Sequence, residues 1–390
     1  MKNIAVIAAP GCEEGETLTI VDIFRRAELS CDLVGLGARD ITGGHGTVFR
    51  CDAVLDEALA STYDMVVLPG GYGGVDAMMA SELLLEQVST MLHEGKWVAA
   101  ICAAPLALDK AGLLEGRTFA CYPGQRANIS AGTWVNEVVV IDGNLVTSQG
   151  PATAWAFAYK LVELMGGDAE AVRQRMVYRN AFDEPAVQSP EPAELKPVPG
   201  PDGHAPKKVA VLMVDGFEES EAIQIVDLLR RAHAEVTTYR FQEDEFVLGM
   251  QDMLVKAEAV FGPAVLEADA IVVPGGRTAG AKLIAREDVL ETLRAFDRAG
   301  KLVCAMCSGT TVAHAAGVLD GKRVTGYTGY AAKLTGAAFV EDEVAVWDAN
   351  VVTSQGPATP YPFAFKLMEA LGTDPQPYKD RLLYALVGGK

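Results

Sequence analysis

The sequence predicts an α/β protein of two tandem domains, each with helices packed on both faces of a parallel sheet. Three observations support this prediction. Short aliphatic runs alternate with segments of helical periodicity, which is typical of buried parallel strands joined by helices. The pattern recurs with an offset of 205 residues, which relates Cys102 to Cys307. A proline-rich stretch separates the two copies.

The aliphatic runs predict the same three strands in each copy: Ile4–Ala8, Met65–Leu68 and Val98–Ile101, then Val209–Val214, Ala270–Val273 and Leu302–Met306. Between them lie helical segments such as Leu83–Leu92. Val138–Ile141 and Leu145–Thr147 predict an antiparallel hairpin, because the Asp142-Gly dipeptide between them is a strong turn signal. Parallel strands joined by right-handed crossovers place the ligand site beyond the carboxyl ends of the strands.

The internal repeat sets the domain boundaries. Val21-Asp-Ile-Phe-Arg-Arg-Ala27 returns as Val226-Asp-Leu-Leu-Arg-Arg-Ala232, and Thr147-Ser-Gln-Gly-Pro-Ala-Thr153 returns one residue later in register at Thr353. This period exceeds the roughly 20–50 residues of solenoid repeats and fits a duplicated domain. Residues 183–207 hold seven prolines, a composition typical of an extended linker. We therefore predict a first domain over 1–182, a linker over 183–207 and a second domain over 208–390.

The composition is that of a compact globular protein. Hydrophobic residues make up 50% of the 390 residues and charged residues 22%, and no apolar run approaches the roughly 20 residues of a membrane span. A formal charge of −19 argues against nucleic acid or an anionic membrane as a partner. Seven scattered cysteines do not form a secreted disulfide framework. We expect a soluble cytoplasmic protein with reduced thiols.

Cys102 is the candidate nucleophile of the first copy. It stands between the predicted strand at Val98–Ile101 and a helix that begins near Pro105. A side chain on such a sharp turn is lifted out of the sheet. The free N–H groups of the helix start would favour the thiolate. Cys307 lies at the same kind of junction in the second copy.

Glu16 and its repeat Glu221 are the candidate acid–base partners of these cysteines. Burial near a thiolate raises the pKa of a carboxyl group, so a protonated Glu16 could donate a hydrogen bond to the sulfur and later carry a proton. The alternative is that Glu16, like Glu13 and Glu14, is an acidic residue favoured at a helix start.

Two pairs of glycines follow predicted strands, at Gly70-Gly71 and Gly275-Gly276. Their N–H groups, with that of Ala103, could form an oxyanion hole, and the alternative is a plain tight turn. Neither pair fits a nucleotide-binding fingerprint, so we expect no cofactor. No metal site is expected, because the histidines do not repeat and the Cys304-Ala-Met-Cys307 spacing has no match in the first copy.

In combination, these motifs resemble the ThiJ/PfpI superfamily, also called the DJ-one family. The residues that carry the resemblance are Glu16, Pro69-Gly-Gly71, Ala100-Ile-Cys-Ala-Ala-Pro105, Cys121-Tyr-Pro-Gly124 and Ser148-Gln-Gly-Pro151. The resemblance implies two flavodoxin-like domains of the class I glutamine amidotransferase type. It also implies the following site residues: nucleophiles Cys102 and Cys307, partners Glu16 and Glu221, and oxyanion donors at the N–H groups of Gly71, Ala103, Gly276 and Ser308. Some relatives have a histidine where this chain has Tyr122 and Tyr327, which leaves glutamate as the proton carrier.

The resemblance implies a glutathione-independent glyoxalase or deglycase that converts small α-oxoaldehydes such as methylglyoxal to hydroxy acids. Two alternatives stay open: a redox-sensing or chaperone-like protective protein whose cysteine is oxidised, and a hydrolase or hydratase of another small electrophile. Proteolysis is disfavoured, because the peptidase-like branch has a histidine directly after its cysteine and this chain has Ala103 and Ser308. The two copies are expected to pack as an intramolecular pseudo-dimer, and further homo-oligomer formation is left open.

Overall fold

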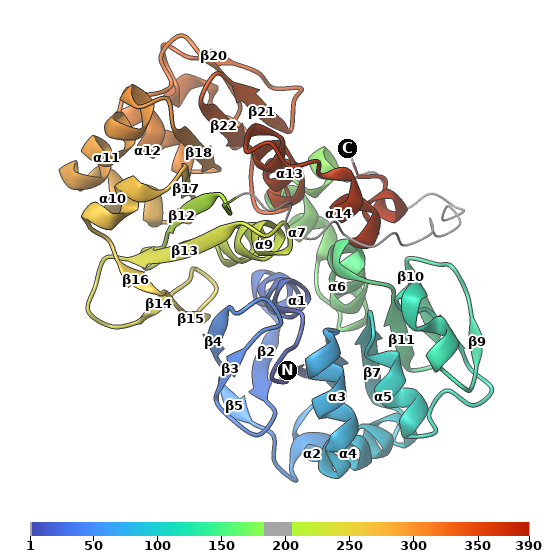
Figure 1. Ribbon diagram of the computed structural model, residues 1–390. Helices are drawn as coiled ribbons and strands as arrows, with labels where there is room; N and C mark the ends of the chain where they lie inside the picture. The colour runs from blue at the N-terminus through green and yellow to red at the C-terminus, as the bar shows by residue number, and fades with distance from the viewer. Residues whose placement is uncertain (1, 183–204, 390) are drawn as a thin grey trace. The chain divides into compact units, whose positions relative to one another are not determined.

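The computed structural model describes residues 2–182 and 205–389, which divide into two compact units (Figure 1). The first unit contains residues 2–173, Phe182 and Lys379–Gly389. The second contains Gln174–Ala181 and residues 205–378. Each unit is thus one copy of the repeat together with a short segment from the end of the other copy. Most of the predicted linker lies outside the described residues, and the domain boundaries stay a prediction.

The sheet of the first unit has the strand order β10-β11-β7-β6-β1-β2-β5. The bounds are Asn3–Ala8 for β1, Ser30–Gly35 for β2, Ala53–Val54 for β5, Met65–Leu68 for β6, Trp97–Ile101 for β7, Val139–Asp142 for β10 and Leu145–Ser148 for β11. Neighbouring strands pair in parallel, and only β10 runs antiparallel, to β11. The predicted strands and the Asp-Gly hairpin are confirmed.

The sheet of the second unit has the equivalent order β16-β13-β12-β17-β18-β22-β21. The bounds are Lys208–Leu212 for β12, Glu235–Arg240 for β13, Ala259–Val260 for β16, Ala270–Val273 for β17, Leu302–Met306 for β18, Ala345–Asp348 for β21 and Val351–Ser354 for β22. The chain therefore contains two mostly parallel sheets of one topology, as the duplicated pattern predicts.

Helices cover both faces of each sheet. In the first unit they are α1 (Glu14–Arg26), α3 (Tyr72–Ala80), α4 (Glu82–His93), α5 (Pro105–Lys110) and α6 (Ala154–Leu164). In the second they are α9 (Glu219–Arg231), α10 (Ala279–Ile284), α11 (Glu287–Arg298), α12 (Gly309–Ala315) and α13 (Pro360–Ala370). Helix α1 packs with α6, and α9 with α13. Among the described residues, no helix combines the length and the apolar character that crossing a membrane requires.

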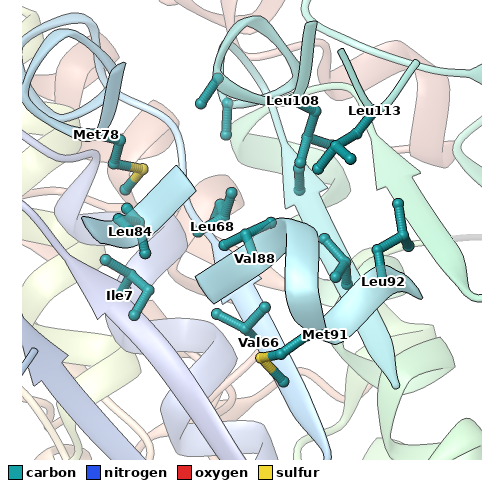
Figure 2. Packing of buried hydrophobic residues seen from close by; sticks show 14 of the residues in the cluster. Ile7, Val66, Leu68, Met78, Leu84, Val88, Met91, Leu92, Leu108 and Leu113 are labelled. Carbon is teal, nitrogen blue, oxygen red and sulfur yellow. The ribbon is translucent and has the colours of Figure 1, made fainter. Parts of the chain in front are cut away.

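One core layer of the first unit lies between the sheet and helices α3, α4 and α5 (Figure 2). Alternate strand residues such as Ile7, Val66 and Leu68 point into it, because successive side chains of a strand face opposite sides. Helix α4 contributes Leu84 and Val88, one turn apart on one face. Burying each such side chain stabilises the fold by about 1.5–3 kcal/mol.

Several short elements connect this framework. They are β3 (Asp40–Thr42), β4 (Val48–Arg50), α2 (Leu59–Thr62), β8 (Thr118–Phe119), η1 (Pro123–Asn128), β9 (Thr133–Trp134), η2 (Pro151–Thr153), α7 (Ala169–Arg175), α8 (Tyr178–Ala181), β14 (Phe246–Leu248), β15 (Leu254–Lys256), η3 (Pro263–Glu267), β19 (Arg323–Val324), η4 (Ala331–Lys333), β20 (Ala338–Phe339), α14 (Gln376–Arg381) and η5 (Tyr384–Val387). The β3–β4 and β14–β15 hairpins were not predicted from the sequence.

Candidate active site

The two candidate cysteines stand on strained turns directly after central strands. Cys102 follows β7 and has a φ of 63°, and Cys307 follows β18 with a φ of 52°. This left-handed conformation costs a residue other than glycine about 1–3 kcal/mol and persists only where neighbours enforce it. Here the Cys102 N–H donates to Ser148 O over 3.2 Å, and its carbonyl accepts from the Tyr122 N–H over 2.8 Å. The predicted turn between strand and helix is confirmed at both positions.

The carboxyl group of Glu16 lies beside the Cys102 thiol, within hydrogen-bond contact. Glu16 is completely buried in α1, and its Oε2 accepts the Gly70 N–H over 2.8 Å. Sheet order brings these groups together, because α1 follows β1, Gly70 follows the neighbouring β6, and Cys102 follows β7. The site thus lies at the carboxyl ends of central strands, next to the β1–β6 step where the strand order reverses.

Glu221 repeats this arrangement in the second unit. It is completely buried, its carboxyl group contacts the Cys307 thiol, and its Oε2 accepts the Gly275 N–H over 2.6 Å. The same cysteine–carboxyl contact is therefore built twice from residues that are far apart in the sequence.

Gly70 is required by the close approach of the cysteine and the carboxyl group. A Cβ at this position would lie 2.5 Å from Cys102 Cβ, 2.7 Å from Glu16 Oε2 and 2.9 Å from Cys102 Sγ. At Gly275 the same three distances, to Cys307 and Glu221, are 2.7, 2.8 and 3.0 Å. Gly71 instead supplies the turn, with a φ of 92°. The glycine pair thus combines a tight turn with a wall of the site.

The protonation of Cys102 departs from the sequence-based expectation of a favoured thiolate. Burial raises the pKa of this thiol, the negative charges of Glu16 and Glu13 raise it further, and the Ala103 N–H lowers it. Helix α5 has only six residues and begins three residues after the cysteine, and burial is the largest cause that acts on the thiol pKa. The causes are the same at Cys307. The expectation that the helix start dominates the thiol pKa was wrong.

These causes show what proton transfer within the pair would change. When Glu16 is ionised, its charge opposes ionisation of the neighbouring thiol. When the proton moves from sulfur to the carboxylate, that repulsion disappears and the carboxylic acid can donate a hydrogen bond to the thiolate. The Ala103 N–H stabilises the sulfur in this state.

The predicted oxyanion donors lie in two different positions relative to the cysteine sulfur atoms. The N–H groups of Ala103 and Ser308 contact the sulfur atoms of the preceding cysteines. Gly71 and Gly276 lie in the adjacent loops after β6 and β17, both with positive φ. The Ser308 hydroxyl donates to Gly276 O over 2.9 Å, which ties the two loops of the second site together. The oxyanion role of these N–H groups stays a prediction.

Both copies of the repeat match one known protein family. The profile of the DJ-1/PfpI family matches residues 2–164 and 207–370. The chain belongs to the DJ-1/PfpI family. Protein DJ-1 homolog B of Arabidopsis thaliana is 31% identical over 94% of this chain and 84% of its own length. A deglycase of Pyrococcus abyssi is 39% identical over 32% of this chain and 76% of its own. The crystal structure of Drosophila melanogaster DJ-1beta is 35% identical, with a TM-score of 0.44, and covers 45% of this chain and 98% of that one.

In this DJ-1/PfpI chain the two tyrosines near the cysteines point their hydroxyl groups at backbone carbonyls. Tyr122 Oη donates to Arg381 O over 3.2 Å, and Tyr327 Oη donates to Arg175 O over 2.9 Å. Both tyrosines therefore connect a site to a neighbouring segment.

Tyr330 is a neighbour of Cys307 that the sequence analysis missed. Its ring meets that of Tyr327 edge to face, with centroids 5.7 Å apart. Burial raises the pKa of Tyr330, and the charge of Cys307 is the next cause. The first copy has Gln125 at the equivalent place. This departure from the repeat, three residues after the motif tyrosine Tyr327, is the signal that could have identified it.

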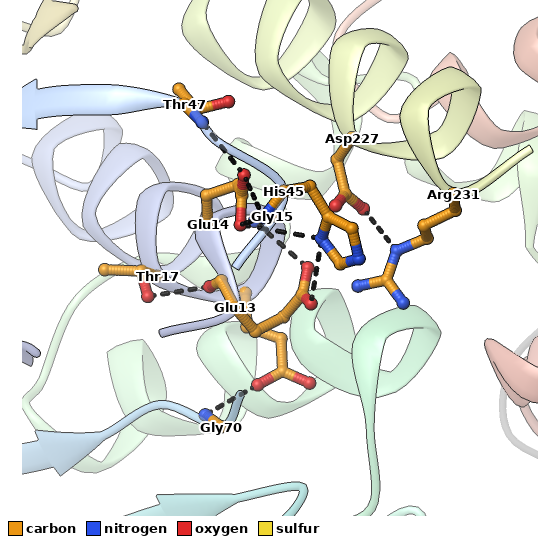
Figure 3. Close-up of polar contacts among 10 residues, drawn as sticks. Glu13, Glu14, Gly15, Thr17, His45, Thr47, Gly70, Asp227 and Arg231 are labelled. Atoms are coloured by element: carbon orange, nitrogen blue, oxygen red, sulfur yellow. Dashed lines mark hydrogen bonds and ion pairs between the residues drawn. The ribbon is translucent and has the colours of Figure 1, made fainter. Parts of the chain in front are cut away.

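The acidic residues at the start of α1 also form structural hydrogen bonds (Figure 3). Glu13 caps the helix by accepting the Gly15 N–H over 3.3 Å. The Glu14 carboxylate, which is completely buried, accepts the backbone N–H groups of His45 over 3.0 Å and Thr47 over 3.3 Å. Glu13 therefore stabilises the start of the helix, and Glu14 connects the helix to the turn of the β3–β4 hairpin.

Proposed function

We propose that each domain converts a small α-oxoaldehyde such as methylglyoxal to a hydroxy acid without glutathione. The observation that carries this proposal is the contact between a cysteine thiol and a buried carboxyl group on a strained turn, present once as Cys102 with Glu16 and once as Cys307 with Glu221. A thiol beside a carboxylate suits nucleophilic attack followed by proton transfer.

In the proposed reaction, Glu16 takes the proton of Cys102, and the thiolate forms a bond to the aldehyde carbon. The aldehyde oxygen gains that proton, with the Ala103 and Gly71 N–H groups as donors to the developing negative charge. Glu16 then removes the hydrogen of this carbon as a proton and returns it to the adjacent carbon. The hydroxyl group on the first carbon gives its proton to the former carbonyl oxygen of the adjacent carbon and becomes the carbonyl of the thioester. The product is a thioester of Cys102. Water cleaves it to the hydroxy acid and restores the thiol, so no external oxidant is needed.

Membership of the DJ-1/PfpI family and the likeness to a protein named deglycase support chemistry at a carbonyl carbon. A deglycase would share the first step, attack of the thiolate on a carbonyl-derived carbon. A reducing compartment such as the cytoplasm keeps these thiols free, and location there remains a prediction from the sequence.

A redox-sensing protective protein is the second candidate. It is favoured by the exposure of the cysteines: Cys102 and Cys307 are partly accessible, whereas the other five are buried. An accessible thiol next to a carboxyl group that can donate a hydrogen bond suits oxidation to the sulfinic acid.

Acid production from methylglyoxal in the absence of glutathione separates these candidates. The wild-type chain should produce acid, and each of Cys102→Ser and Cys307→Ser should keep a fraction. The double variant should produce none, because the remaining carboxylates are too weakly basic to activate a serine hydroxyl. Full activity of the double variant would exclude this mechanism, and an inactive wild type would favour the sensor.

A further inference from the structure

Each copy of the repeat ends in a short segment that belongs to the unit of the other copy. Gln174–Ala181 belongs to the second unit, and Lys379–Gly389 belongs to the first. They also repeat each other, since Arg175-Met-Val-Tyr178 returns as Arg381-Leu-Leu-Tyr384 at an offset of 206 residues. This is the offset at which the Ser-Gln-Gly-Pro motif repeats. We call them the exchanged segments.

In the first unit, the exchanged segment packs against residues that hold Cys102. Leu382 O accepts the Ala152 N–H over 3.0 Å, next to the acceptor contact of Arg381 O with Tyr122. A Cβ built on Gly150 would lie 3.0 Å from Leu383 Cδ1, so the Leu383 side chain covers that glycine. Leu383 is 5% exposed.

In the second unit, the other exchanged segment makes the same contacts. Met176 O accepts the Ala358 N–H over 3.0 Å, next to the contact of Arg175 O with Tyr327. Val177 Cγ2 would lie 3.0 Å from a Cβ on Gly356, and Val177 is 7% exposed. Both contacts of the first unit thus recur at the equivalent residues.

Both segments are held in a costly backbone conformation at the same position. Val177 has a φ of 54° and Leu383 a φ of 61°. Positive φ is uncommon for residues other than glycine, and for a β-branched residue such as valine it is an outlier that the surroundings must enforce. The repeated strain shows that docking of these residues is strongly specified in both units.

The docked segments bear directly on the cysteines. Tyr122, which donates to the segment through its hydroxyl group, donates to Cys102 O through its backbone N–H. Ser148, which accepts the Cys102 N–H, is two residues before Gly150. The exchanged segment therefore packs on the same two stretches of chain that hold the strained Cys102 backbone, one at Tyr122 and one at Ser148–Gly150.

We propose that Leu383 is a positioning residue for the Cys102 site and Val177 for the Cys307 site. Each site is then held in its working geometry by the end of the opposite copy, so that neither copy supplies a complete site alone. The proposal rests on the proposed function only because both concern the same two cysteines. It predicts thiol reactivity, which can be measured without turnover.

The test uses the full chain and measures both cysteines in one sample. Leu383→Asp and Val177→Asp each place a charge in a buried contact and undock one segment. Wild type and variants are treated with iodoacetamide, and alkylation at Cys102 and Cys307 is followed by peptide mass spectrometry. Leu383→Asp should slow alkylation of Cys102 at least about fivefold and leave Cys307 within about twofold, because the released backbone no longer holds the thiol against the carboxyl group that accepts its proton. Val177→Asp should give the reverse.

A crossed pattern supports the exchange, and two other patterns overturn it. If Val177→Asp changes Cys102, which shares its half of the sequence, each copy completes its own site. If either variant changes both cysteines alike, the effect is general unfolding and the proposal fails. Leu383→Met and Val177→Ile are matched controls that keep an apolar side chain of similar size. In these variants Cys102 and Cys307 should be alkylated at wild-type rates. Tyr122→Phe and Tyr327→Phe, which remove one hydrogen bond each, should shift the same cysteines in the same direction by less.

Turnover gives an independent check. In a Cys307→Ser background, Leu383→Asp should lower kcat/KM for methylglyoxal, whereas Val177→Asp should not. A chain without methylglyoxal turnover that still shows the crossed alkylation pattern would refute the proposed reaction and keep this proposal.

Discussion

Replacing Glu16 with glutamine separates the two ways in which the Cys102 thiol can lose its proton. In the wild-type chain the carboxylate contacts the thiol and can accept its proton inside the site. Glutamine has a similar shape and still offers an oxygen to the Gly70 N–H, which Glu16 Oε2 accepts over 2.8 Å. Its amide cannot take up a proton, so the variant thiol has to ionise to water.

The sign and the size of the effect follow from the causes of the pKa shift. The charge of Glu16 disappears in the variant, but burial, the largest cause that raises the pKa of Cys102, remains. An ordinary cysteine pKa of about 8.5 leaves roughly 3% thiolate at pH 7. Burial keeps the pKa of the variant thiol above that value and the internal base is gone, so alkylation of Cys102 at pH 7 should fall at least about a hundredfold, the lower end for loss of a general base.

The pH dependence gives a second measure of the same effect. Internal transfer needs no net loss of a proton, so alkylation of wild-type Cys102 should change little between about pH 7 and 9. In Glu16→Gln the thiolate is the minor form below a raised pKa, and its amount should rise about tenfold for each pH unit over that range.

Iodoacetamide labelling with peptide mass spectrometry measures both quantities. Cys307, with its own Glu221, is an internal control in the same chain, and Glu221→Gln should reverse the pattern. An unchanged rate at Cys102 in Glu16→Gln would refute internal proton transfer. An equal loss at both cysteines would mean that the substitution disturbs the whole fold.

Three further outcomes are expected. Gly70→Ala should slow alkylation and turnover at Cys102 and lower the free energy of unfolding in urea by about 1–3 kcal/mol, since its Cβ would overlap the cysteine and the carboxyl group; wild-type behaviour would contradict the close approach. Mild peroxide should add oxygen first at Cys102 and Cys307, because the other five cysteines are buried, and peptide masses that show a buried cysteine oxidised first would refute this. Small-angle scattering should show one compact particle if the duplicated domains form a pseudo-dimer, and independently moving halves would refute that prediction.

The fold could be predicted from the sequence because buried parallel strands carry a strong local signal. Met65–Leu68 and Leu302–Met306 have the predicted bounds. Pro69 ends the first run, and the second ends at the turn of Cys307. The Asp142-Gly turn fixed the hairpin of β10 and β11 in the same way. Duplication added a second, independent copy of each signal.

Other features depend on contacts that no local pattern encodes. The thiol pKa of Cys102 depends on burial by residues from several strands, so the start of a short helix was a poor guide. The exchanged segments could have been found from Arg175-Met-Val-Tyr178 and Arg381-Leu-Leu-Tyr384, but their repeat is short and does not show on which unit each segment packs.

The charges around each thiol also restrict which electrophile the site can favour. Glu13 and Glu16 both raise the thiol pKa of Cys102 through their negative charge, so the same charges oppose an anionic ligand at that place. A neutral aldehyde meets no such repulsion, and the hydroxy acid formed from it leaves as an anion that these carboxylates disfavour. Methylglyoxal should therefore give a higher kcat/KM than an α-oxoaldehyde of similar size that carries a carboxylate on its side chain. A preference for the anionic substrate would mean that a cation, rather than the carboxylates, dominates the potential at the sulfur.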